Sequence, residues 1–272
     1  MSAVPIPRLD GSGRLTQARI VRSEWTKFIT VKSTLWSLGI GMFLTLAFPI
    51  LFAAVTSSHW GTMSPNERAD SNPMDIALAG VNVAQLAIAV LGVLVISAEY
   101  STGMIRSTLL AVPKRAPVLW AKLTVFGVVS FLLTLPAVLV SFYASQAILD
   151  RHHLLQVSIS SPGVLRVIVG SALYVVGVGV LALAIGAIVR NTAGGISAFV
   201  GLFFVIPPLM NILPRAWNEG ISKWLPSETG RQLFALQRDP ARFAQWPSGA
   251  IFLGYCVLAV AIAAVLLRRR DA

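Results

Sequence analysis

The stretch Ser-Ala-Glu-Tyr-Ser-Thr-Gly-Met-Ile-Arg-Ser-Thr-Leu-Leu, residues 97–110, separates two long apolar runs. It carries Glu99 and Arg106, whereas the runs on either side of it hold almost no charge. Charged side chains are costly in hydrocarbon and ordinary in water. The stretch is therefore predicted to lie outside a bilayer, and the runs that flank it are predicted to cross one.

The composition of the whole chain agrees with this division. Of its 272 residues, 56% are hydrophobic and only 12% are charged, and the mean hydropathy is +0.75. Soluble domains carry about 25% charged residues. A chain with so little charge needs lipid rather than water around most of its surface, so we expect an integral membrane protein.

Six apolar runs are long enough to be transmembrane helices. The first has 22 residues, which is about 33 Å of helix against a hydrocarbon core of about 30 Å. The third continues as far as Leu149, so it tilts, bends at Pro136 or projects beyond the bilayer. The expected fold is all-α and polytopic, a single transmembrane domain over residues 15–272, with spans at about 34–55, 76–97, 118–142, 164–189, 193–213 and 249–267.

The N-terminal region is predicted to have two parts. Residues 1–14 are expected to form a disordered tail, and they show no apolar core of a cleavable signal peptide. Residues 15–30 have the period of an amphipathic helix. We interpret this helix as interfacial, with Trp25 and Lys27 as its anchors at the headgroup level. The alternative is a short cytoplasmic helix packed on protein.

The distribution of basic residues predicts the orientation. Of the 22 Lys and Arg residues, 14 lie in segments that six spans place on one side and 8 lie on the other. Cytoplasmic loops carry the excess of Lys and Arg. Both termini and the 97–110 stretch are therefore predicted to be cytoplasmic in the plasma membrane. The net charge of +11 is interpreted as attraction to anionic lipid, with no nucleic-acid partner.

Motifs for catalysis or metal binding are missing from the sequence. It contains no G-x-x-x-x-G-K-[ST] phosphate loop, no H-E-x-x-H pair, no G-x-S-x-G elbow and no second cysteine beside Cys256. His152 and His153 are adjacent, so their side chains point in different directions. We predict that the chain is not an enzyme and binds no cofactor or metal.

The predicted spans contain no Asp, Glu, Lys or Arg away from their ends. Ion-coupled transporters keep such groups inside the membrane because coupling requires them. If this protein moves a solute against a gradient, the energy has to enter from outside the membrane. The internal segment best placed to receive it is the 97–110 stretch.

Three segments resemble the ABC-2 type permease family, in its small six-span bacterial form. The first is Ser23-Glu24-Trp25-Thr26-Lys27 with residues 32–36, and the third is Leu225-Pro226-Ser227 with Gly230. The second and most specific is Glu99-Tyr100-Ser101-Thr102-Gly103-Met104-Ile105-Arg106-Ser107-Thr108-Leu109. The resemblance covers nearly the whole chain.

The resemblance implies a permease subunit that pairs with a second permease, identical or related, and with two copies of a separate ATPase. That ATPase would use ATP and Mg, and the complex would export an amphipathic or hydrophobic substrate. A cytoplasmic coupling helix between spans two and three would dock on the ATPase, with Glu99 in its first turn and Arg106 facing an acidic partner. The alternative is an ordinary amphipathic connector. The implied docking residues are Glu99, Tyr100, Gly103, Met104, Ile105, Arg106, Ser107 and Thr108.

Several interpretations stay open on sequence alone. Asn82 and Gln85 are three residues apart on one helix face, and they either line a translocation path or bond to a neighbouring helix. Pro136 and the Pro207-Pro208 pair are candidate kinks. The glycines of the fourth span indicate close helix packing. Two rival functions are a non-transporting membrane sensor or assembly component that docks an ATPase, and a membrane-embedded enzyme.

Overall fold

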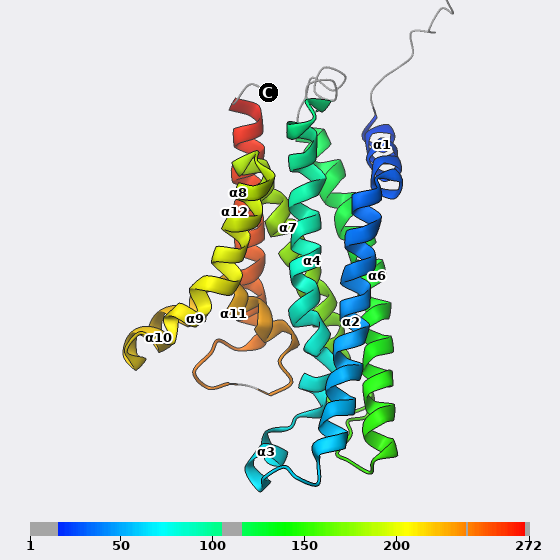
Figure 1. Ribbon diagram of the computed structural model, residues 1–272. Coiled ribbons are helices and arrows are strands. Elements are labelled where there is room, and N and C mark those ends of the chain that lie inside the picture. The colour runs from blue at the N-terminus through cyan, green and yellow to red at the C-terminus, as the bar shows by residue number, and fades with distance from the viewer. Residues whose placement is uncertain (1–15, 105–115, 238, 270–272) are drawn as a thin grey trace, which may run out of the picture.

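The computed structural model describes residues 16–104, 116–237 and 239–269, and every regular element in this part is a helix. Six helical segments are long and apolar enough to cross a membrane, which confirms the predicted all-α, six-span fold. Figure 1 shows the arrangement. The helices are α1 (Gln17–Thr30), α2 (Lys32–His59), α3 (Pro65–Asp70), α4 (Pro73–Ser101), α6 (Ala116–Arg151), α7 (Val164–Val189), α8 (Thr192–Val200), the π-helical turn η1 (Gly201–Val205), α9 (Ile206–Met210), α10 (Arg215–Ile221), η2 (Ser222–Trp224), α11 (Pro226–Arg231), η3 (Gln232–Phe234) and α12 (Gln245–Arg269).

The centre of the bundle is formed by α4 and α7. Among the six spans these two bury the largest share of their residues, whereas the span formed by α8, η1 and α9 buries only 17%. α2 and α6 pack on α4, and α12 packs on the other side of α7. The core therefore lies along the α4–α7 contact, and the fifth span lies at the edge of the protein.

Glycines make the α4–α7 contact possible. A β-carbon at Gly92 of α4 would lie 2.4 Å from the carbonyl oxygen of Gly179 on α7, which no side chain tolerates. Small residues at such crossings let two backbones approach closely in lipid. The prediction that the glycines of the fourth span serve close packing is confirmed at Gly179, where a β-carbon would lie 2.4 Å from the Phe126 ring of α6.

Helix α6 is longer than the predicted 118–142 span. It runs without interruption to Arg151, and Pro136 lies inside it rather than at a break. Its 36 residues correspond to about 54 Å, well beyond a hydrocarbon core of about 30 Å. Figure 1 shows α6 and α2 extending together past the start of α12.

The fifth span changes direction near its middle. The π-helical turn η1 ends at Val205, and one residue later come Pro207 and Pro208, which lack the backbone N–H that a regular α-helix uses. In Figure 1, α9 and α10 bend away from the other helices. Of the two predicted kink sites, the diproline is thus the one that coincides with a change in helix geometry.

The chain after α10 folds back on the bundle. Residue Gly230 of α11 lies against the Tyr174 ring, where a β-carbon would come within 2.4 Å of the ring. Arg166 of α7 donates hydrogen bonds to the carbonyl oxygens of Leu233 and Ala235, at 3.3 and 3.0 Å. These contacts hold the η2–α11–η3 segment beside α7 and α12.

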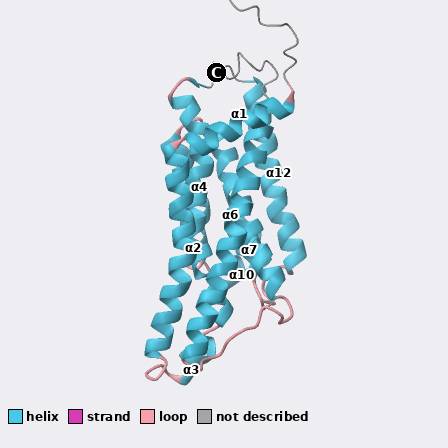
Figure 2. Ribbon diagram, turned by 90° about the vertical axis from the view of Figure 1, so that its right-hand side faces the viewer, coloured by secondary structure: helices cyan, strands magenta, loops and turns pink. Residues whose placement is uncertain are grey.

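The segments predicted to share one side of the membrane lie at one end of the bundle. This end, upper in Figures 1 and 2, holds α1, the end of α4, the start of α6 and the end of α12. Six spans require this arrangement, because an even number of crossings returns the chain to the side where it began. Which side of the membrane this end faces stays a prediction.

Candidate functional site

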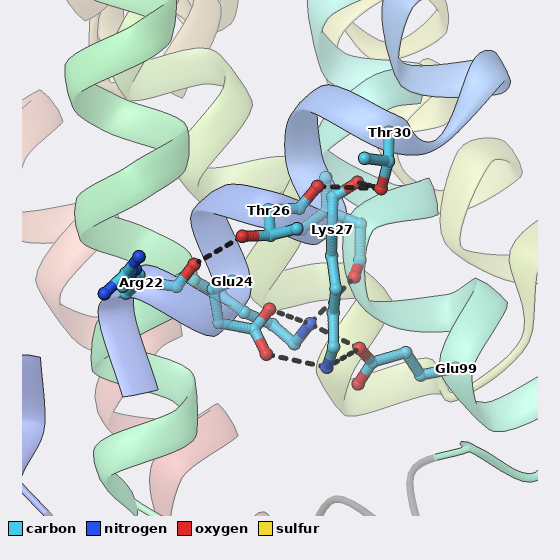
Figure 3. A network of polar contacts seen from close by, with 8 residues as sticks. Arg22, Glu24, Thr26, Lys27, Thr30 and Glu99 are labelled. Atoms are coloured by element: carbon cyan, nitrogen blue, oxygen red, sulfur yellow. Dashed lines mark hydrogen bonds and ion pairs between the residues drawn. The ribbon is translucent and has the colours of Figure 1, made fainter. Parts of the chain in front are cut away.

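Four charged side chains from three helices meet at this end of the bundle, and we call them the charge cluster. α1 supplies Glu24 and Lys27, the last turn of α4 supplies Glu99, and the start of α6 supplies Lys122. Figure 3 shows Glu24, Lys27 and Glu99 converging. Because its members are far apart in sequence, the cluster joins three separate segments of the chain.

Each ammonium group of the charge cluster contacts both carboxylates. Lys122 Nζ lies 2.7 Å from Glu24 Oε2 and 2.8 Å from Glu99 Oε1. Lys27 Nζ lies 2.8 Å from Glu24 Oε1 and 2.9 Å from Glu99 Oε1. Charge-assisted hydrogen bonds of this length are roughly twice as strong as neutral ones. The two cations therefore bridge the two anions in a closed arrangement with no net charge.

Three of the four members of the charge cluster are buried, and Lys27 is partly exposed. Glu24, Glu99 and Lys122 are only 5%, 7% and 3% exposed. A single ion in such a place loses several kcal/mol of hydration free energy. Because each charge here has two opposite neighbours, the cost is offset only while all three helices stay together. The cluster thus makes the position of α1 depend on α4 and α6.

The sequence of α1 explains why Glu24 faces inward. Ile20, Glu24 and Phe28 recur every four residues and form the buried face of α1. Phe28 packs edge-to-face on Phe126 of α6, with ring centroids 6.3 Å apart. Ile20 and Phe28, one turn before and one turn after Glu24, therefore hold Glu24 against Lys122.

The charge cluster corrects the prediction that Glu99 begins a docking helix. Helix α4 does not end at residue 97 but continues through Glu99 and Tyr100 to Ser101. The left-handed backbone at Gly103, with φ of +71°, follows directly after it. Glu99 therefore belongs to the bundle, because its carboxylate pairs with Lys122 and Lys27 inside it.

The other predicted docking residues have different environments. Tyr100 is half-buried, and the Arg190 guanidinium lies 5.1 Å from its ring centroid. Met104 is 48% exposed at the start of the connection between α4 and α6. Ile105, Arg106, Ser107 and Thr108 lie outside the described residues. Docking on an ATPase stays a prediction for all of them.

The predicted interfacial anchors also differ from each other. Trp25 is 43% exposed on α1, as an interfacial anchor requires. The ammonium group of Lys27 is bonded into the charge cluster instead. Burial lowers the pKa of Lys27, but its bonds to Glu24 and Glu99 outweigh this and raise the pKa above its ordinary value. α1 therefore packs on the protein by one face and exposes Trp25 on another.

Two members of the charge cluster, Glu24 and Lys122, were not among the predicted site residues. A usable signal was present, since a lysine within an apolar run needs a carboxylate or carbonyl partner nearby. The sequence alone does not say which carboxylate that partner is.

Asn82 and Gln85 lie in different surroundings although they share a helix. Gln85 is 2% exposed, and its Oε1 accepts a hydrogen bond of 2.5 Å from the Tyr174 hydroxyl of α7. Its Nε2 donates to the backbone oxygen of Asn82 at 2.8 Å. The side chain of Asn82 is exposed. The interhelical bond is thus confirmed for Gln85, and the path interpretation stays a prediction for Asn82.

Replacing Tyr174 with phenylalanine is expected to destabilise the protein by about 1–2 kcal/mol, because the buried Gln85 Oε1 would lose its donor. Unfolding in detergent, followed by circular dichroism, measures the effect. The double variant Tyr174→Phe with Gln85→Leu serves as the control and should recover part of the loss, since no buried acceptor is then left unpaired. Equal stability of the wild type and Tyr174→Phe would contradict the importance of this bond.

Together, the helices and the buried cluster define a multi-pass membrane protein in which a polar site ties three helices at one end. Among the described residues, no group of three or more His, Cys, Asp and Glu side chains is placed to hold a metal ion. Comparison of the chain with protein-family models and with curated proteins gives no match.

Proposed function

We propose that this chain is the membrane-spanning permease subunit of an ATP-driven transporter, and that a separate ATPase docks on the connection between α4 and α6. The observation that carries the proposal is the charge cluster. Glu99 precedes this connection and Lys122 follows it, and each is ion-paired to α1, Lys122 to Glu24 and Glu99 to Lys27. A force on the connection would therefore act on three helices at once.

The packing inside the bundle offers a route for that force. α4 is in backbone contact with α7 at Gly92 and Gly179 and with α2 at Gly80 and Thr45. Close-packed interiors transmit strain because they do not compress. A displacement of α4 would thus carry α7 and α2 with it. The fifth span, which is the least buried, could then move independently of α2, α4 and α7.

The substrate side of the proposal rests on α4. Its exposed side chains include the amide of Asn82 and the apolar side chain of Leu86, at 38% exposure. Apolar surface with a few amides suits an amphipathic or hydrophobic solute. A cytoplasmic position of the charge cluster agrees with the excess of basic residues at that end of the bundle.

The docking part of the proposal can be tested with Met104→Glu combined with Arg106→Glu. We expect this variant to lose at least tenfold in co-purification with the ATPase and in ATP-dependent flux into vesicles, because an apolar contact is lost and the charge is reversed. Met104 is 48% exposed but lines the same pocket as Glu24 and Glu99, so the folding of the variant is checked by its elution from a sizing column. A matched control is Leu155→Glu with Arg151→Glu, two exposed residues at the opposite end of the bundle.

This experiment distinguishes the proposed function from its alternative. Full ATP-dependent flux in the Met104→Glu, Arg106→Glu variant would contradict docking at this connection. Binding of an ATPase by the wild type without flux of any solute would favour the alternative, a non-transporting component that recruits a soluble partner. If the Met104→Glu, Arg106→Glu variant inserts poorly or elutes as more than one species, the Leu155→Glu, Arg151→Glu variant shows whether two such substitutions at the other end of the bundle have the same effect.

A further inference from the structure

An apolar groove runs along the outside of the bundle between α6 and α12. Its volume is about 310 Å³, and Val180 of α7 forms its floor. Trp120 and Leu123 of α6 form one wall, and residues of α12 from Leu253 to Ala264 form the other. Such a volume is at the small end of the range for ligand sites, about 300–1,000 Å³.

The dimensions of the groove match a lipid chain. Leu253 and Ala264 are eleven positions apart on α12, or about 16 Å along a helix, which is about half of a 30 Å hydrocarbon core. One leaflet of a bilayer has this depth. The side chains at its rim are open to the surroundings, with Trp120 at 55% and Leu253 at 62% exposure. An acyl chain can therefore enter from the side.

The stripe of α12 that lines the groove continues toward an arginine at the end of the helix. On α12 the residues Val257, Ala261 and Ala264 line the groove, and a spacing of three or four residues continues this stripe to Arg268. The next residue, Arg269, points about 100° further round the helix. Both arginines are exposed. Trp120 lies near the start of α6, at this same end of the bundle, where an aromatic ring favours the headgroup level.

From this combination we propose that the groove binds an anionic phospholipid. One acyl chain lies between α6 and α12 on Val180, and the phosphate meets the guanidinium group of Arg268. The apolar wall supplies the affinity for the chain, and Arg268 supplies the preference for a negative headgroup. Arg269, off the stripe, plays no direct part in binding.

The test measures how much lipid the purified full-length chain retains. The protein is exchanged into detergent with phosphatidylglycerol or phosphatidylcholine of identical acyl chains, and bound lipid is counted by native mass spectrometry. We expect the wild type to retain phosphatidylglycerol over phosphatidylcholine. Arg268→Gln should reduce the retained phosphatidylglycerol about fivefold, whereas Arg269→Gln should change it by less than about twofold.

A second pair of variants tests the groove itself. Ala261→Trp fills the groove and should lower retention of phosphatidylglycerol at least as strongly as Arg268→Gln does. Ile262→Trp is the matched control, since Ile262 is 42% exposed beside Ala261 and does not line the groove. Thermal unfolding of each variant shows that it is folded. Equal retention of the two lipids, equal effects of the two arginine variants, or unchanged retention in Ala261→Trp would each overturn the proposal.

Discussion

Replacing Lys122 with methionine is expected to lower the free energy of unfolding by about 3 kcal/mol, near the lower limit for breaking a buried ion pair. The substitution leaves Glu24 and Glu99 buried, with Lys27 as their remaining cation. One uncompensated negative charge then stays on two carboxylates that are at most 7% exposed. Thermal or denaturant unfolding in mild detergent measures the loss.

A matched variant separates the charge effect from the loss of packing. Combining Lys122→Met with Glu99→Gln removes one cation and one anion, so the remaining pair, Glu24 and Lys27, is neutral in sum. We expect this double variant to recover at least half of the loss, because well-packed neutral residues often replace buried ion pairs at little cost. If Lys122→Met unfolded at the wild-type temperature, the charge cluster would not be what ties α1 to the bundle.

The charge cluster also predicts a functional effect of losing Lys122. If force is transmitted as proposed, Lys122→Met and the double variant with Glu99→Gln should both still bind the ATPase, since neither changes the exposed residue Met104. Lys122→Met should then lose coupling between ATP hydrolysis and flux, because the α6 end of the connection is no longer ion-paired to Glu24 of α1, while Glu99 at the α4 end still pairs with Lys27. The ratio of solute moved to ATP hydrolysed is the quantity to compare.

The second large effect is expected at the helix crossings. Gly92→Ala should cost about 1–3 kcal/mol, since overpacking a tight contact forces the backbones apart. The β-carbon would lie 2.4 Å from the Gly179 carbonyl oxygen, and backbone cannot move aside as a flexible side chain does. Gly80→Ala should behave alike, because its β-carbon would lie 2.4 Å from the Thr45 carbonyl oxygen.

Two other glycines in the spans provide the control for these variants. Gly39 of α2 and Gly254 of α12 have no atom within 4 Å of a β-carbon placed on them. Alanine at either should leave stability unchanged or raise it slightly, because alanine is the better helix former by up to about 1 kcal/mol. Melting temperatures in detergent give the comparison. A similar loss at all four positions would show that glycine acts through helix flexibility and not through close approach.

Much of the fold followed from the sequence because lipid imposes a simple rule. Each span has to be apolar over about 20 residues, and every backbone group inside the bilayer has to be bonded within its helix. The run after residue 164 satisfies both conditions, and α7 begins at Val164 and ends at Val189, as predicted. The point where α6 leaves the membrane could not be predicted so closely, because residues 142–149 contain no charged side chain that would mark it.

The candidate site was only partly predictable. The sequence drew attention to Glu99 as a charge next to an apolar run, which is correct, but placed it in a separate docking helix, which is wrong. Helix α4 continues past residue 97 because Glu99 finds Lys122 and Lys27 to pair with. Periodicity places a residue on a face of its own helix, and it carries no information about the helix opposite.

The sequence by itself determined the number of spans, the segments that share one end and the lack of known catalytic motifs, because these depend on local composition and on counting crossings. Only the tertiary structure decided that Glu24, Lys27, Glu99 and Lys122 form one buried cluster and that Gln85 is bonded to Tyr174. The physical reason is that a buried charge or amide is stable only beside a particular partner. That partner lies up to 98 residues away along the chain, as for Lys122 and Glu24, and only the packing of the helices brings it within hydrogen-bond distance.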